Sequence, residues 1–195
     1  MNTLKAEKRS MDVKAKKLRR EGFVTGNMFG KEIEKSIPVK MQKKDVDRLL
    51  KTNNKGSQIM LDVDGQQYDV LIKEISFNSL KHQIEEIDFQ ALVSGEKVHS
   101  VAEIVLLNHE KVATGVLQQM LHEIPFKAVP AALVEKVEIN VAELRVGDTV
   151  KVKDLEIASD KDVELMIDPE EIVVMLSEAH NAPAEEEENT PAEEA

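Results

Sequence analysis

Alternation of hydrophobic and polar residues is strongest in the middle of the N-terminal half. Ile59, Leu61 and Val63 point to one face of a predicted strand, and a second apolar run follows at residues 70–72. The dipeptide Asp64-Gly65 separates the two runs, and such a pair is typical of the two-residue turn of a β-hairpin. The pattern therefore predicts a hairpin here.

Further strands are predicted on either side of the hairpin. The segment SIPVKM, residues 36–41, predicts a short strand, and IEEIDFQALV, residues 84–93, predicts a longer one. Ile87, Phe89 and Ala91 share one face of the latter. Together these segments predict a small β-sheet or barrel.

Two helices are predicted in the same half. Asp12 is positioned to cap a helix that reaches Arg20, with Met11, Ala15 and Leu18 on one narrow apolar strip. The segment KKDVDRLLK, residues 43–51, predicts a second helix, which the turn residues NNKG end. We thus expect a barrel with two helices.

The half of the chain after residue 94 shows short apolar runs separated by turn signals. Strands are predicted from AEIVLL, VLQQMLHEIPF, VEKVEINV, TVKVKDLEI and EEIVVML, and NVAELRVGD is expected to form one helical turn. The break SGEKVHS marks a predicted boundary, and Ala, Pro and Glu dominate the end of the chain. We predict a mainly β protein with a barrel domain at 1–94, a β-rich domain at 95–179 and a disordered acidic tail at 180–195.

Charge divides the chain in the same way. The 195 residues carry a formal net charge of -11. Residues 1–94 hold 18 Lys and Arg against 14 Asp and Glu, whereas residues 95–195 hold 8 against 23. Absent cysteines and the lack of a long apolar run favour a cytoplasmic protein with no membrane contact. The asymmetry indicates two units with different partners.

No catalytic or metal-binding pattern stands out. The five histidines are scattered, without the spacing of a metal site. Glu85 and Glu86 are neighbours on a predicted strand, where alternation should turn them to opposite faces and prevent joint acid–base catalysis. We expect neither an enzyme, nor a cofactor, nor a metal.

Basic residues instead cluster in the stretch KAEKRSMDVKAKKLRREG, residues 5–22. A lysine-rich helix is often only a solvated surface. Here, however, the basic residues are concentrated at one end of an acidic protein, which favours contacts to the phosphates of a nucleic acid. Such contacts should be salt-sensitive. Double-helical RNA would be bound through its backbone and shape.

Three segments together resemble a known family. LRREGFVTGNMFG, VDGQQYDVLIKEI with IEEIDFQALVSGEKV, and INVAELRVGDTVKVKDL occur in the order found in large-subunit ribosomal protein number twenty-five, in its long two-domain form called Ctc or general stress protein. The resemblance covers residues 4–176. It implies an N-terminal barrel that binds 5S ribosomal RNA in the large subunit, near neighbouring ribosomal proteins, and a separate β-rich second domain.

The resemblance also implies which residues contact RNA. Phosphate contacts would come from Arg9, Lys14, Lys16, Lys17, Arg19 and Arg20, and further RNA-binding positions would be Phe29, Gly30, Lys73 and Asp88. From the residues alone, Phe29 is also explained by core packing, and Gly30 by backbone geometry.

The chain departs from the family pattern at the predicted RNA surface. Thr25 replaces a proline, and Ser76, Phe77, Asn78 and Ser79 replace a Gln-Arg-His-Pro run; Glu86 stands where the family has histidine. Each lost charged hydrogen bond costs roughly 1.5–3 kcal/mol. Two hypotheses follow: a ribosomal protein that binds 5S RNA, or a stress-associated relative that kept the fold, lost this binding and acts as a protein-interaction module.

Overall fold

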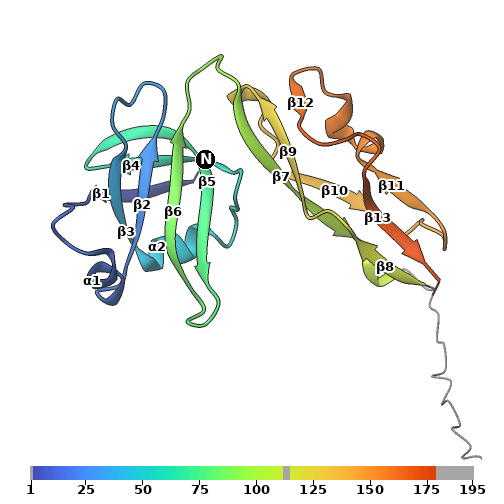
Figure 1. Ribbon diagram of the computed structural model, residues 1–195, viewed down its shortest axis with the longest axis horizontal. Coiled ribbons are helices and arrows are strands. Elements are labelled where there is room, and N and C mark those ends of the chain that lie inside the picture. The colour runs from blue at the N-terminus through green and yellow to red at the C-terminus, as the bar shows by residue number, and fades with distance from the viewer. Residues whose placement is uncertain (1, 112–114, 179–195) are drawn as a thin grey trace, which may run out of the picture.

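The computed structural model describes residues 2–111 and 115–178. Two β-rich units lie side by side in it, one built from β1–β6 and the other from β7–β13 (Figure 1). The mainly β architecture predicted from the sequence is therefore confirmed. The predicted tail lies outside the described residues.

The first unit is a closed six-stranded barrel. Its strands follow the order β1-β3-β2-β6-β5-β4, and parallel pairing of β1 with β4 closes the ring. Helix α2 packs near β1 and β3, and α1 near β2. The elements are β1 (Thr3–Lys8), α1 (Ala15–Arg20), β2 (Phe23–Phe29), β3 (Ile37–Gln42), α2 (Lys43–Leu49), β4 (Gln58–Val63), β5 (Gln66–Asn78) and β6 (Gln83–Ala91).

Aliphatic side chains fill the barrel, as the low aromatic content requires. Phe89 is the one fully buried aromatic residue among the described residues of this core, and it lies among Val, Ile, Leu and Met side chains. The predicted core face of Ile87, Phe89 and Ala91 is confirmed, because the first two are buried and the third packs against the same cluster.

The predicted hairpin is confirmed in detail. Val63 pairs with Gln66, so Asp64 and Gly65 form the whole turn. Both turn residues have positive φ, 51° and 90° respectively, as a type I′ turn demands. The predicted second helix and the strand at residues 36–41 also appear, as α2 and β3.

The start of α1 differs from the prediction. The N-cap position is occupied by Lys14, and no side chain caps the helix. Asp12 instead accepts a hydrogen bond from Ser10 Oγ at 2.8 Å, within a turn that precedes the helix. The predicted Asp12 cap is therefore wrong: this short acidic side chain is used by the local turn.

The second unit contains two open sheets that share one core. Their orders are β10-β7-β9-β12 and β11-β13-β8. Four 3₁₀ turns connect strands: η1 (His109–Lys111), η2 (Pro130–Ala132), η3 (Val152–Asp154) and η4 (Glu156–Ser159). The strands are β7 (Val98–Leu107), β8 (Val116–Gln119), β9 (Glu123–Ala128), β10 (Lys136–Asn140), β11 (Thr149–Lys151), β12 (Val163–Leu165) and β13 (Ile172–Ser177).

Three local predictions in this unit differ from the structure. The run VLQQMLHEIPF forms two strands, β8 and β9, and TVKVKDLEI is a strand only over β11 before it continues as η3 and η4. The predicted helical turn is also wrong. The segment 140–148 contains turns rather than a helical turn. Asn140 Oδ1 accepts a hydrogen bond from the Ala142 amide, and Asp148 Oδ2 accepts one from the Arg145 amide at 2.8 Å. The Arg145 amide, which a helical turn starting at Val141 would use, is thus bound to the Asp148 side chain instead. The barrel ends at Ala91 and β7 begins at Val98, and we retain the boundary near residue 95 as a proposal.

The loop between α2 and β4 and the first residue of β4 contact the second unit. Lys55 Nζ lies 2.9 Å from Glu123 Oε2 of β9, and the Gln58 amide donates to Glu135 Oε1. Gly56 is fully enclosed here: it has φ +88°, and a Cβ atom at this position would overlap the carbonyl oxygen of Val101. A residue without a side chain therefore lets the barrel approach β7 closely.

Replacing Gly56 by alanine should weaken this junction. The methyl group forces the loop away from β7, and positive φ adds backbone strain of about 1 kcal/mol or more. We expect a larger radius of gyration by small-angle X-ray scattering and a lower melting temperature. Gly147→Ala is the matched control, because φ there is +96° but nothing lies within 4 Å of an added Cβ. Equal behaviour of the two variants would contradict a role for Gly56 in joining the units.

No helix within residues 2–111 and 115–178 is long and apolar enough to cross a bilayer.

Candidate nucleic-acid interface

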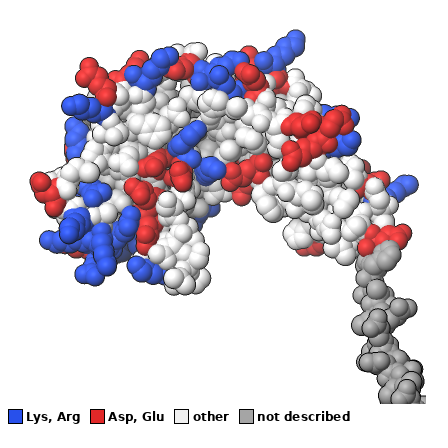
Figure 2. Space-filling model, viewed as in Figure 1, with Lys and Arg blue, Asp and Glu red and all other residues white. Residues whose placement is uncertain are grey.

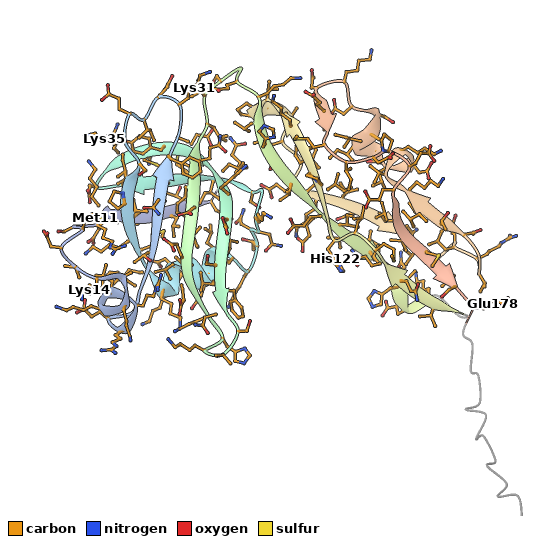
Figure 3. All side chains as sticks on the ribbon, viewed as in Figure 1. Met11, Lys14, Lys31, Lys35, His122 and Glu178 are labelled. Carbon is orange, nitrogen blue, oxygen red and sulfur yellow. The ribbon has the colours of Figure 1, made fainter. Side chains whose placement is uncertain are left out.

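Helix α1 presents a cluster of free cations. Leu18, at 5% exposure, anchors the helix on the barrel, and this turns the other faces outwards. Lys14, Lys16, Lys17 and Arg20 are all exposed, and we call these four residues the α1 patch. Figure 2 shows Lys and Arg gathered over α1, and Figure 3 places Lys14 at the end of the barrel away from Lys31 and Lys35.

The α1 patch is almost free of internal ion pairs. Among the described residues, its one salt bridge joins Lys17 Nζ to Glu21 at 3.9 Å, with both side chains exposed. Such a surface pair contributes little and leaves the lysine available. Four of the six predicted phosphate-contact residues therefore lie exposed together (Figure 2), and their contact with RNA stays a prediction.

Arg19 lies on the same helix but points inwards, towards β6. Its guanidinium lies 3.3 Å from Glu85 Oε2 and 3.9 Å from Glu86 Oε2. It also donates to the Glu85 carbonyl oxygen at 3.1 Å. Both neighbouring carboxylates reach the one guanidinium, contrary to the expectation that strand alternation would separate them. Arg19 is thus paired with two carboxylates at a partly exposed site of the barrel surface.

Residues that depart from the family pattern extend this network. Thr25 is fully buried, and its hydroxyl lies 3.4 Å from Arg19 Nη2 and 3.3 Å from the Glu85 carbonyl oxygen. Asn78 Nδ2 donates to Glu85 Oε1 at 2.8 Å. Three of the substituted positions, Thr25, Asn78 and Glu86, therefore contribute to holding Arg19 or its partner Glu85.

Arg9 also serves local structure. Its Nη2 donates to the Val13 carbonyl oxygen at 3.1 Å, just before α1 begins. Its Nε is buried and has no hydrogen-bond partner among the described residues. Arg9 therefore supports the turn that leads into α1, and its guanidinium is only partly accessible.

Phe29 and Gly30 lie apart from the α1 patch. Phe29 ends β2 and Gly30 follows it, so the seven residues of this strand place them roughly 20 Å from the end of α1. Phe29 is 37% exposed, and a Cβ at Gly30 would approach Ala91 Cβ to 2.9 Å. The barrel thus requires Gly30 for close packing, independently of any ligand.

Lys73 and Asp88 are likewise engaged within the protein. Lys73 Nζ donates to the His99 carbonyl oxygen at 2.8 Å, in a cleft between the units. Burial, with a smaller effect from the positive charge of Lys55, lowers the pKa of Lys73. Asp88 Oδ1 accepts from the Asn27 amide at 3.0 Å and so ties β6 to β2.

The β5–β6 hairpin carries exposed apolar residues that the sequence reading missed. Phe77 is 57% exposed and Leu80 is 96% exposed, and the Phe77 ring lies edge-on to His82 with 6.5 Å between ring centroids. Within the hairpin, Asn78 and Lys81 both contact Glu85 of β6, which is also the partner of Arg19. The sequence signal for this exposed apolar site was Leu80, an apolar residue placed within a turn.

Within the described ranges, no group of three His, Asp or Glu side chains is arranged to hold a metal ion.

Comparisons with known proteins agree with the resemblance. Residues 4–89 match the model of the Ribosomal L25p family, and residues 97–180 match that of the ribosomal protein TL5 C-terminal domain. The protein named large ribosomal subunit protein bL25 from Bacillus velezensis is 32% identical over 181 residues, covering 90% of this chain and 88% of that protein.

Two further relatives bear the same name. The Enterococcus faecalis protein is 32% identical, over 86% of this chain and 83% of its own length. The Listeria monocytogenes protein is 31% identical, over 90% of this chain and 85% of its own length. Members of this group are structural rather than catalytic proteins. Given these matches and the two β units, the chain belongs to the bL25 family of large ribosomal subunit proteins, in its long two-domain form.

Proposed function

We propose that this chain binds 5S ribosomal RNA in the large ribosomal subunit of the cytoplasm, through the α1 patch. The observation that carries the proposal is the set of four exposed cations on one short helix and its N-cap residue, Lys14. Family membership supplies the class of partner, because the relatives bear the names of large-subunit proteins.

The size of the α1 patch suits a duplex backbone. Residues 14–20 span about 9 Å along the helix axis, and each strand of a duplex carries a phosphate roughly every 3.4 Å of its axis. The four side chains can therefore meet phosphates on both sides of a groove. Direct reading of base edges is not required, because duplex RNA is recognised mainly by shape and backbone.

The Arg19 network limits the strength of this interface. Glu85 and Glu86 lie beside the α1 patch and repel phosphate, while they occupy the guanidinium of Arg19. We therefore assign phosphate contacts to Lys14, Lys16, Lys17 and Arg20, and a positioning role to Arg9 and Arg19. Asp88, Gly30 and Lys73 support the fold around the interface, and neighbouring ribosomal proteins would meet the second unit.

A gel-shift titration with 5S RNA over a salt series tests the proposal. Four phosphate contacts give a slope of log K against log salt of about -3 to -4, which weakens binding about a hundredfold between 50 and 200 mM salt. Transfer RNA is the control for non-specific attraction. If the chain binds both RNAs equally, the alternative of a protein-interaction module that has lost RNA binding replaces the proposal.

A further inference from the structure

Strand β10 leaves one edge of its sheet open. It pairs with β7 in parallel and occupies the end of the order β10-β7-β9-β12. The amides of Glu103 and Val141 and the carbonyl oxygens of Glu135 and Leu107 join the two strands. Because successive residues of a strand direct their backbone groups to opposite sides, the N–H and C=O groups of residues 136, 138 and 140 point away from β7. Among the described residues, no strand pairs with that side.

A groove runs beside this open edge. It has a volume of about 750 Å³ and lies between β10 and the η3–η4 segment, with β11 contributing Val150. Apolar side chains form part of its lining, including Leu107, Leu155 and Ile157. In Figure 1, β10 lies between β7 and the β11–β13 ribbons. Open backbone groups and apolar surface together are what an added strand requires.

The charged residues along the groove are mostly acidic. The lining includes Glu138, Asp154, Glu156 and Asp160, against one cation, Lys136. None of these five makes a salt bridge with another described residue.

Nearby lysines do not neutralise the groove. Lys151 and Lys153 bind Glu170 at 2.8 and 2.7 Å. Their hydrogen bonds lower the pKa of Glu170 to about 2. The two lysines and Glu170 together leave one positive charge, and Lys153 is also attracted to Asp154. Four carboxylates against Lys136 and this one charge still leave the groove with a net negative charge.

We propose that this groove binds an extended basic peptide segment of a partner protein, which adds to the open edge of β10 as a further strand. Alternate side chains of such a strand point to opposite sides. Apolar residues of the segment enter the groove, and its lysine or arginine residues meet the four carboxylates. Charge complementarity selects this occupant, since RNA and acidic peptides are repelled by the same carboxylates.

A fluorescent peptide of alternating lysine and valine, seven residues long, probes the site. We expect binding to the full chain that shifts the NMR amide signals of Lys136, Glu138 and Asn140 and weakens at least tenfold from 50 to 300 mM salt. A peptide with glutamate in place of lysine should not bind. Two results overturn the proposal: equal binding of both peptides, or no binding of the lysine peptide at a concentration of about 1 mM, which would detect even a weak complex.

Single charge reversals localise the binding. Glu156→Lys should weaken the lysine peptide about five- to tenfold, by exchanging attraction for repulsion at the groove. Glu143→Lys is the matched control, because Glu143 is also exposed and in the same unit but does not line the groove. The proposal fails if the two variants bind alike.

A second variant addresses the open edge itself. Glu138→Pro removes an outward N–H group, and proline is tolerated at such edge positions. It should weaken peptide binding at least tenfold. The NMR amide signals of β7 report whether the sheet persists in this variant. If the sheet is intact and the affinity for the lysine peptide is unchanged, strand addition is contradicted.

Discussion

Reversing Lys16 and Lys17 to glutamate should weaken binding to 5S RNA about a hundredfold at 100 mM salt, because two phosphate contacts become repulsive. Both side chains are exposed, and Lys17 has only the long contact to Glu21. The fold should be unaffected, since Leu18 supplies the buried contact of α1. A gel-shift titration measures the loss of affinity. The slope of log K against log salt should become shallower by about two.

The matched control reverses Lys31 and Lys35, which lie at the other end of the barrel (Figure 3). It changes the net charge by the same amount and leaves the α1 patch intact. We expect a loss of less than about threefold, from long-range repulsion alone. Equal losses in the two double variants would show that binding follows net charge rather than the α1 patch.

Neutralising Glu85 and Glu86 with glutamine should strengthen binding to 5S RNA about tenfold or more. The change removes two negative charges beside the α1 patch and releases the Arg19 guanidinium for a charge-assisted hydrogen bond. The same change should lower the melting temperature slightly, because the Arg19 pairs are only partly exposed. Affinity and melting temperature are measured on the same samples.

Glu32→Gln with Glu34→Gln is the corresponding control. Both residues are exposed on the β2–β3 connection and make no ion pair with another described residue. This variant removes two negative charges far from α1 and should change affinity less than threefold. If the Glu85 and Glu86 variant gains no more than the control, the Arg19 network does not restrain RNA binding.

The sequence predicted the features that depend on local chemistry. Asp64-Gly65 marks a hairpin because both residues tolerate positive φ, and Ile87 and Phe89 mark a core face through strand periodicity. The electropositive surface of α1 was also predictable, since Leu18 fixes which side of a short helix faces the barrel.

The sequence did not predict features that depend on distant residues. Strand β1 was missed, because Leu4 and Ala6 are its only buried side chains amid lysine and glutamate. The pairing of Arg19 with Glu85 joins residues 66 positions apart, so local periodicity carries no sign of it. The Asp12 cap failed for a local reason instead: Ser10, two residues earlier, donates a hydrogen bond to this carboxylate in the preceding turn.

Hydrogen exchange of the full chain, with and without 5S RNA, tests the role of the α1 patch most directly. We predict slower exchange in residues 14–22 and in the adjacent β5–β6 hairpin when RNA is bound. The β2–β3 connection and the second unit should exchange as in the free protein. Protection of residues 98–177 with no change in residues 14–22 would contradict RNA binding through the α1 patch.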